Sequence, residues 1–485
     1  MERRSFLQTL AGSLAYAGLT GCRHGHENRP NVVLVLVDDL GWTDVSCFGS
    51  KYYETPNIDR LCAGGMKFTG AYAACAVCSP TRSSIMTGRY PTRTGITDWI
   101  HFRDPRVKEA LKNNTEITGY DPGGNRPMLT PANQFWLKHE EITIPELLKS
   151  RGYTSCHIGK WHLGPKPYYP ETQGFDYNIG GCEYGQPPAY FDPYANKRLK
   201  GIPTLPPRKE GEYLTDRESD EAVRFIREHK DQPFFLYMAH YAVHSPLQAK
   251  EKMIEKYKAK AKTNQKNPVY AAMVESVDQA VGRIMATLKE LNLQENTIVI
   301  FNSDNGGASH FFATDNSPLR KGKGFPYEGG IRVPLIVSRP GVTKPGSICD
   351  QPVISMDLLP TIARAAGADL PQNRRIDGLD LLPLLRQTGT LPRKTLYWHF
   401  PHYWWGTHVQ PYSIVRNGDW KLIHWYQNDQ FELYNIKNDI GETTDLAVRM
   451  PVKVANLRKK LAVWLQETGA KMPVKNPDYK PEEKK

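Results

Sequence analysis

Cysteine is scarce in this sequence, with 8 residues in a chain of 485. So few cysteines exclude a scaffold that depends on dense disulfide cross-links. Long apolar runs are lacking as well: only residues 6–19 form a weakly apolar stretch, which excludes a protein that crosses a membrane many times. Lysine and arginine outnumber the acidic residues, 63 to 51, without clustering in the body of the chain. The net charge of +12 therefore favours anionic partners and does not indicate nucleic acid.

The remaining composition is that of an ordinary globular protein. Hydrophobic residues make up 40% of the chain and charged residues 24%, which excludes an entirely disordered chain. The length favours either about three domains or one large α/β domain with a smaller appendage.

The first 21 residues have the pattern of an export signal. Arg3 and Arg4 precede the apolar stretch, and small residues follow it. The Arg3-Arg4-Ser5-Phe6-Leu7 segment resembles a twin-arginine signal, and Leu19-Thr20-Gly21-Cys22 resembles the cleavage box of bacterial lipoproteins. We expect an exported protein, periplasmic or at the cell surface, with membrane attachment only through a lipid anchor at Cys22. A cleaved signal in which Cys22 is incidental is the alternative.

Four apolar runs predict buried strands, and each is followed by polar residues of catalytic type. The runs are residues 32–37, 153–158, 233–238 and 297–301. They lead to Asp38-Asp39, to Lys160-Trp161-His162, to His240 and His244, and to Asp304-Asn305. Unbroken apolar runs are typical of strands that are buried on both faces, and helical patterns such as residues 144–150 and 219–229 provide the crossovers of a parallel sheet. We predict an α/β fold with a large central sheet, mixed and mainly parallel, flanked by helices, and a ligand site beyond the strand ends.

The acidic residues at two of these strand ends predict a cation site. Asp38, Asp39, Asp304 and Asn305 offer only oxygen ligands, which suit Ca²⁺ or Mg²⁺. Two adjacent carboxylates after a buried strand would repel each other unless a cation neutralised them. The alternative is that one pair caps a helix and the other belongs to a turn.

A cysteine stands at the predicted start of a helix that spans about residues 78–88. Pro80 suits the first helical turn and Gly88 suits the helix end. Cys78 would then lie where free backbone N–H groups favour an anion, with Arg82 one turn further on the same side. The alternative is a small buried cysteine beside the helix cap.

The segment Cys78-Ser79-Pro80-Thr81-Arg82 resembles the C-x-P-x-R signature of type I sulfatases, the formylglycine-dependent arylsulfatase and N-acetylgalactosamine-6-sulfatase-like branch of the alkaline phosphatase superfamily. Residues 152–162 resemble the second signature of that family. Further segments occur in the family's order, namely Asp38-Asp39, His244-Ser245-Pro246-Leu247, Asp304-Asn305-Gly306 and residues 322–330. The resemblance covers about residues 31–450 and implies an alkaline-phosphatase-like fold.

The resemblance also implies a mechanism. Cys78 would be oxidised to formylglycine, whose hydrated aldehyde attacks the sulfate ester. One Ca²⁺ ion would be held by Asp38, Asp39, Asp304, Asn305 and residue 78. Arg82, Lys160 and Lys323 would form a cationic sulfate clamp. His162 would take a proton from the diol, and His244, with Lys323, would protonate the leaving alcohol. In the loop at residues 180–185 we find no equivalent of the polar side chain with which some members orient sulfate.

The sequence pattern changes near residue 396. Short aromatic and β-branched segments alternate with turn signals such as Asn417-Gly418, and a helical pattern follows at residues 451–469. We therefore predict a signal peptide (1–21), a linker (22–30), a sulfatase catalytic domain (31–395), a C-terminal α+β subdomain with an antiparallel sheet and a helix (396–473), and a disordered tail (474–485). The aromatic loop at residues 401–408 is expected either to line a carbohydrate subsite or to pack between the domains, and the long insertions 101–140 and 183–213 are expected to recognise the substrate.

The sequence favours a calcium-dependent sulfatase that acts on a sulfated carbohydrate or aryl sulfate. A formylglycine-generating enzyme or an anaerobic sulfatase-maturing enzyme would be its second partner. A phosphatase or phosphonate monoester hydrolase of the same superfamily is one alternative, since a phosphate would also fit a metal and three cations. A lipoprotein that binds sulfated glycans without catalysis is the other.

Overall fold

The computed structural model describes residues 29–113, 115–121 and 123–481. The predicted export signal and Cys22 lie outside these residues, so localisation and lipid anchoring stay predictions. Within the described residues, every helix is too short or too polar to span a bilayer.

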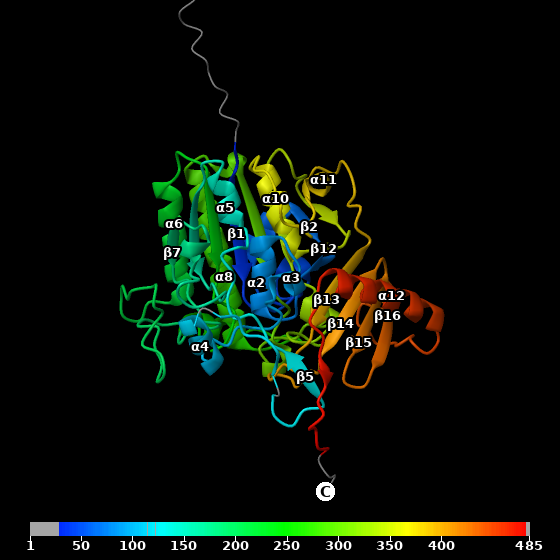
Figure 1. The fold of residues 1–485 in the computed structure, drawn as a ribbon. Coiled ribbons are helices and arrows are strands. Elements are labelled where there is room, and N and C mark those ends of the chain that lie inside the picture. Colours follow the sequence, from blue (N-terminus) through cyan, green and yellow to red (C-terminus); the bar gives the residue numbers. More distant parts are fainter. Residues whose placement is uncertain (1–28, 114, 122, 482–485) are drawn as a thin grey trace, which may run out of the picture.

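A twisted sheet of eight strands forms the centre of the molecule (Figure 1). Its order is β11-β2-β10-β9-β1-β8-β6-β7. The strands are β1 (Asn31–Val37), β2 (Met66–Phe68), β6 (Thr154–Gly159), β7 (Tyr177–Ile179), β8 (Phe234–Ala239), β9 (Thr297–Ser303), β10 (Leu335–Ser338) and β11 (Ser347–Cys349). The five strands from β9 to β7 are parallel, whereas β10 runs antiparallel to both of its neighbours. The predicted mixed, mainly parallel α/β sheet is confirmed.

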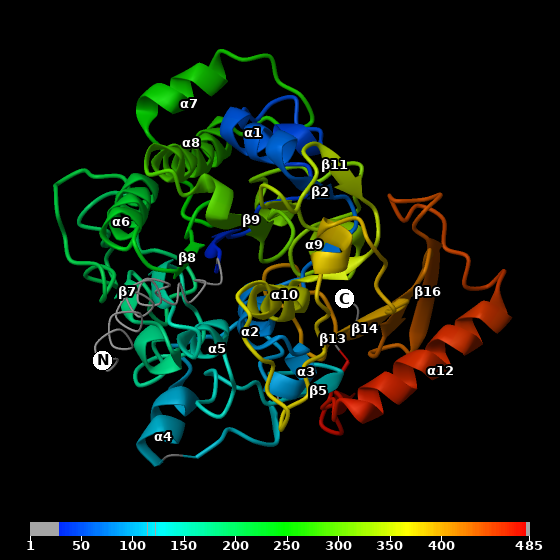
Figure 2. The ribbon, with the colours of Figure 1, turned by 90° about the horizontal axis from the view of Figure 1, so that it is seen from above.

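Strand β1 shows why the central runs are apolar without interruption. Val33 and Val35 point into one hydrophobic core, while Leu34 and Leu36 point into the other. The first core is covered by α1 (Pro56–Gly64), α6 (Leu214–Glu228), α7 (Glu251–Lys258) and α8 (Pro268–Glu290). The second is covered by α2 (Cys78–Thr87), α4 (Pro105–Asn113), α5 (Ile144–Lys149), α10 (Leu358–Ala365) and α11 (Leu382–Leu385). Figure 2 shows α7 and α8 on one side of the sheet and α2 and α10 on the other.

The smaller C-terminal domain is an antiparallel sheet of four strands in sequential order. These strands are β13 (Thr395–Phe400), β14 (Tyr412–Asn417), β15 (Trp420–Trp425) and β16 (Gln430–Asn435). Helix α12 (Pro451–Glu467) packs on the sheet through Leu457, Leu461 and Trp464, which share a core with the sheet's own apolar residues. The predicted sheet and helix are confirmed.

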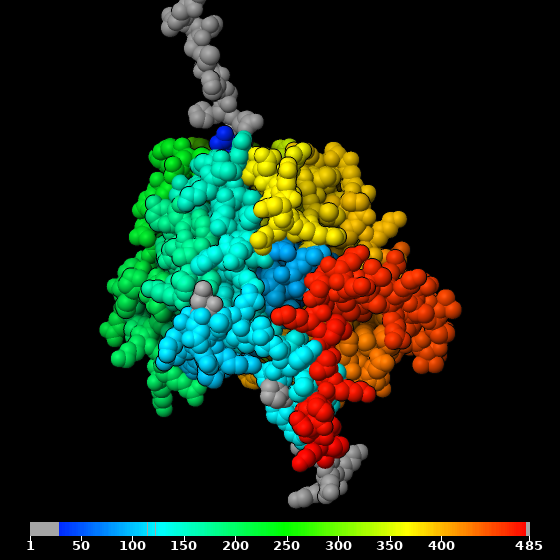
Figure 3. Space-filling view, viewed as in Figure 1, coloured from blue at the N-terminus to red at the C-terminus, as the bar shows by residue number. Residues whose placement is uncertain are grey.

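The end of the chain differs from the disordered tail predicted for residues 474–485. Strand β17 (Val474–Lys475) pairs with β5 (Met128–Pro131) of the first insertion, which also pairs with β4 (Tyr120–Asp121). The Asn476 N–H then donates a 3.0 Å hydrogen bond to the Pro127 carbonyl. Figure 3 shows this red segment lying beside the cyan insertion. Pairing with the edge of β5 thus orders a segment whose polar composition predicts disorder. Residues 482–485 lie outside the described residues.

A buried ion cluster joins the two domains. Lys421 on β15 lies 3.1 Å from Glu328, which begins the short helix α9 (Glu328–Ile331), and 2.8 Å from Glu442. All three side chains are buried, and Glu442 depends on Lys421 for compensation of its charge, whereas Glu328 also lies 3.5 Å from Arg332.

Lys421→Met is therefore expected to lower the free energy of unfolding by about 3–5 kcal/mol, because it leaves the buried Glu442 carboxylate without its cation, next to Glu328. Urea denaturation followed by circular dichroism measures this change. The control is Lys459→Met on the exposed face of α12, which is expected to stay within about 0.5 kcal/mol of the wild type. Equal stability of the two variants would contradict the proposed role of Lys421.

Candidate active site

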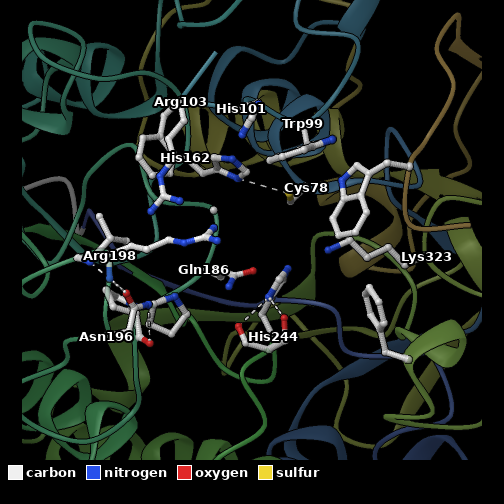
Figure 4. A pocket seen from close by; sticks show the side chains of 18 of the residues that line it. Cys78, Trp99, His101, Arg103, His162, Gln186, Asn196, Arg198, His244 and Lys323 are labelled. Carbon is white, nitrogen blue, oxygen red and sulfur yellow. Dashed lines mark hydrogen bonds between the residues drawn. The ribbon is translucent and has the colours of Figure 1, made fainter. Parts of the chain in front are cut away.

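A pocket of about 400 Å³ lies beyond the carboxyl ends of the parallel strands. Its lining includes four of the residues predicted from the sequence, namely Cys78, His162, His244 and Lys323. Figure 4 shows these side chains around one cavity. The structure therefore brings together residues that are up to 245 positions apart (323 − 78 = 245).

Cys78 is the first residue of α2 and faces a histidine. Its side chain is buried, and Sγ lies 3.3 Å from Nδ1 of His162. The other ring nitrogen, Nε2, lies 2.9 Å from the Ile100 carbonyl, which can only accept a hydrogen bond. Nε2 therefore carries the proton, and Nδ1 of the neutral ring presents a lone pair to residue 78.

Burial sets the charge states of this pair. Desolvation, followed by the positive charge of Lys160, lowers the pKa of His162 well below its ordinary value. Desolvation raises the pKa of the Cys78 thiol, although Lys160 and Lys323 oppose this rise. At neutral pH the site thus holds a neutral thiol beside a neutral imidazole, and a neutral thiol is a weak nucleophile.

The segment that follows β6 carries Lys160 and His162, and its backbone departs from the extended conformation of the strand. Strand β6 ends at Gly159, and His162 adopts a left-handed backbone with φ of 58°. A non-glycine residue in this region costs on the order of 1–3 kcal/mol. The Trp161 side chain is buried in the hydrophobic core.

The predicted cation ligands lie at the ends of neighbouring strands, β1 and β9. The Asp39 N–H donates a 3.2 Å hydrogen bond to Oδ1 of Asp304, and Asp39 also has a left-handed backbone, with φ of 59°. Nδ2 of Asn305 donates to Oδ1 of Asp39 at 2.8 Å. Gly306 allows this turn, because a Cβ there would lie 1.8 Å from the Gly329 carbonyl oxygen.

Each carboxylate of the site is paired with a predicted clamp residue. Lys160 Nζ lies 2.6 Å from Asp38, Lys323 Nζ 2.6 Å from Asp39, and Arg82 Nε 2.8 Å from Asp304. The three positive charges balance the three negative ones. Burial opposes ionisation of Asp39, yet Lys323 and His244 lower its pKa below the ordinary value.

The three clamp residues lie at different depths relative to the pocket. Lys323 lines the pocket, whereas the side chains of Arg82 and Lys160 are fully buried behind the carboxylates. Arg82 also donates a 2.7 Å hydrogen bond from Nη1 to the Lys160 carbonyl, which ties the two sequence signatures together. Arg82 and Lys160 therefore neutralise the carboxylates of Asp304 and Asp38 in this structure.

The donor set fits a hard divalent cation. Among the described residues, Oδ1 of Asp38 and Oδ1 of Asn305 are buried and have no hydrogen-bond partner, which is costly for polar atoms that have no ligand. Desolvation raises the pKa of Asp38 well above its ordinary value, and a cation would oppose this rise. Asp38, Asp39 and His244 also place ligand atoms within 4.8 Å of one another. Asp38, Asp39, Asp304 and Asn305 would hold the ion.

Comparison with known proteins identifies the family. The sequence profile described as "Sulfatase" matches residues 30–368, and the profile described as "N-sulphoglucosamine sulphohydrolase, C-terminal" matches residues 321–471. The chain belongs to the sulfatase family. The first of these matches covers the large sheet and its site, and the second covers the small domain.

Named relatives of this sulfatase align over most of their length. A sulfatase of Formosa agariphila is 34% identical, with 91% of this chain and 90% of the relative covered. Arylsulfatase A of Homo sapiens is 33% identical, with 86% and 77% covered. The crystal structure of Ps i-CgsB in complex with k-i-k-neocarrahexaose has 30% identity and a TM-score of 0.75, with 90% of this chain and 92% of that chain covered.

The walls of the sulfatase pocket come largely from the two long insertions, residues 101–140 and 183–213. The first insertion and the residues just before it contribute Trp99, His101, Phe102 and Arg103, and the second insertion contributes Gly185, Gln186, Pro187, Pro188, Asn196, Arg198 and Leu199. The sequence predicts that the two insertions recognise the substrate, but it does not single out a residue in either of them. These long loops carry no periodic pattern that could single one out.

The aromatic loop of the small domain both packs against the catalytic domain and lines the pocket. Trp404 is 4% exposed and packs against Gly324, where a Cβ would lie 1.9 Å from its ring. Trp405 is 59% exposed and lines the pocket. Trp404 therefore fixes the loop to the catalytic domain, and Trp405 adds to the substrate wall of this sulfatase.

Proposed function

We propose that this sulfatase hydrolyses an O-sulfate ester of a carbohydrate, with a formylglycine made from Cys78 as its nucleophile and a bound calcium ion. The ligands of the ion would be Asp38, Asp39, Asp304, Asn305 and residue 78. The observation that carries the proposal is the position of Cys78 at the helix start, facing the unprotonated Nδ1 of His162. Sulfated carbohydrates are proposed because the structurally similar Ps i-CgsB was solved with a neocarrahexaose.

Calcium, when bound, would neutralise charge on the sulfate and favour ionisation of the attacking hydroxyl. The charges of the surrounding side chains already balance, so the bound ion would give the site a net positive charge. An anionic ester would be attracted to this charge. Lys323 lines the pocket and is placed to contact the sulfate. His162 Nδ1 is placed to accept a proton from the residue-78 side chain as sulfate leaves.

His244 is proposed to protonate the leaving oxygen together with Lys323. Nδ1 of His244 donates to the Ser245 carbonyl at 3.0 Å, so Nε2 is the nitrogen that remains available, 3.5 Å from Asp39. Desolvation and then Lys323 lower the pKa of His244 to about 3, while Asp39 opposes this shift. A bound sulfate would offset the charge of Lys323 and so strengthen the affinity of the ring for a proton.

His244→Ala is expected to affect substrates according to their leaving groups. The loss in kcat/KM should be on the order of 10²–10⁴ for a sugar or alkyl sulfate, because the alkoxide needs a proton, and below about tenfold for 4-nitrophenyl sulfate. Steady-state rates on a series of sulfate esters of increasing leaving-group pKa measure this dependence. His162→Ala is the comparison, with losses that do not follow the leaving group. Equal losses by His244→Ala across the series would contradict its role as the acid.

The reaction class is tested with matched aryl esters. Protein produced together with a formylglycine-generating enzyme is assayed on 4-nitrophenyl sulfate and 4-nitrophenyl phosphate. We expect turnover of the sulfate to exceed that of the phosphate by orders of magnitude. A preference for phosphate would instead favour a phosphatase or phosphonate monoester hydrolase. The absence of turnover of either ester by fully converted protein would favour a non-catalytic glycan-binding protein.

We also propose that the chain is exported and carries a lipid at Cys22. The support is the sequence of residues 1–22 alone. A formylglycine-generating or anaerobic sulfatase-maturing enzyme would be required as a partner for Cys78. Labelling of cells with a fatty acid analogue, with Cys22→Ser as the control, tests the anchor.

A further inference from the structure

Two arginines from different insertions face the active-site pocket without an acidic partner. Arg103 comes from the first insertion and Arg198 from the second, and both line the cavity. Among the described residues, the guanidinium of Arg103 lies over the Phe102 ring, at 5.2 Å from its centroid, and neither Arg103 nor Arg198 forms an ion pair. Figure 4 shows both guanidinium groups on the same side of the cavity, opposite Trp99 and Lys323. Two like charges that share a cavity wall favour an anion between them.

The opposite wall is aromatic and exposed. Trp405 is 59% exposed and Phe311 49%, with their ring centroids 6.4 Å apart. The ring of Trp99 lies 6.3 Å from that of Trp405. Exposed aromatic rings of this kind bind the apolar faces of sugar rings. The pocket therefore combines a platform for a sugar ring with a cationic wall that faces it.

The cationic wall is separate from the reacting centre. Figure 4 shows Arg103 and Arg198 across the cavity from Cys78 and Lys323, where the ester would be cleaved. A neutral sugar would leave the two guanidinium groups uncompensated beside the bound ligand. A saccharide with a further anionic group would instead form charge-assisted hydrogen bonds with them.

We propose that the pocket binds a saccharide with a second anionic group, a sulfate or a carboxylate, beyond the ester that is cleaved, and that Arg103 and Arg198 bind this second group. This inference rests on the proposed function, because it specifies the substrate of the same site. It makes the two arginines determinants of substrate specificity.

Binding is measured by calorimetry in a Cys78→Ala background, so that it does not depend on turnover. The first probe pair is a carrageenan tetrasaccharide with two sulfates in each disaccharide repeat and one with a single sulfate. The second pair is a chondroitin 6-sulfate disaccharide with its carboxylate intact or reduced to an alcohol. We expect the more highly charged member of at least one pair to bind about tenfold tighter or more, and the pair that discriminates identifies the group.

Arg103→Ala/Arg198→Ala is expected to reduce this preference to about twofold or less, since the neutral side chains leave no partner for the second anion. Arg449→Ala, an exposed arginine outside the pocket, is the control and should keep the preference. The inference is overturned if neither pair is discriminated, or if the double variant keeps the wild-type ratio. Discrimination without turnover of 4-nitrophenyl sulfate by converted wild-type protein would support the inference while contradicting the proposed hydrolysis.

Discussion

Replacing Cys78 by alanine is expected to lower kcat/KM for aryl sulfates by a factor on the order of 10⁴ or more, because it removes the proposed nucleophile and leaves only the binding groups. The Cys78 side chain contacts His162 through Sγ and belongs to a helix that is held by its own backbone bonds. Alanine is also the best helix former. The fold should therefore survive the substitution.

The loss must be separated from unfolding and from the thiol itself. Thermal denaturation compares the variant with the wild type, and Cys349→Ala, which removes a thiol from the edge strand β11, is the matched control with expected wild-type activity. Mass spectrometry of the peptide that covers residues 77–82 should show sulfur replaced by oxygen and two hydrogens lost in active wild-type protein. An active Cys78→Ala variant, or active protein with an intact thiol, would refute the assignment of residue 78.

Asp304→Asn is expected to lower kcat/KM by about 10²–10³-fold, because it removes one of the charges that attract calcium. The substitution keeps the volume of the side chain and an oxygen that can accept from the Asp39 N–H. It removes the charge that pairs with Arg82 at 2.8 Å. The three buried cations would then face only two carboxylates.

Calcium-dependent stability provides a readout that does not require turnover. At a concentration of 100 Kd, calcium should stabilise the wild type by about 2.7 kcal/mol, and this gain should largely disappear in Asp304→Asn. Asp278→Asn is the matched control: Asp278 is also buried, but it accepts hydrogen bonds from the backbone of Asn57 and Ile58. This control should lose stability and keep its response to calcium. A full response in Asp304→Asn would exclude Asp304 as a ligand.

Four of the five parallel strands could be predicted because they are buried on both faces, whereas the short, partly exposed β7 could not. Residues 32–37 and 297–301 are apolar without interruption, and the observed strands differ from these ranges by one or two residues. The other half of the sheet could not be predicted, because β2 and β11 are three-residue strands whose partners lie far away in sequence. Helix α6 begins at Leu214, five residues before the predicted start, within a charged stretch that shows little periodicity.

Site residues could be predicted where side chains of catalytic or metal-binding type directly follow a predicted strand. Asp38 and Asp304 follow neighbouring strands, and residue type alone suggested a cation. The depth of Lys160 behind Asp38 depends on tertiary packing, and so does the left-handed backbone of His162. Arg198 lies in a loop without periodicity, so its place in the wall of the pocket that also contains Cys78 could be known only from the fold.

The contact between Trp404 and Gly324 has a consequence for efforts to shorten the enzyme. Gly324 follows Lys323 directly, and its N–H donates to the Ala76 carbonyl, two residues before Cys78. A truncation before Thr395 would remove the tryptophan that seats this stretch and, with Trp405, one side of the cavity. The C-terminal region thus helps to build the active-site pocket, and libraries that aim to change the accepted sulfate ester should diversify residues 401–408 together with the two insertions.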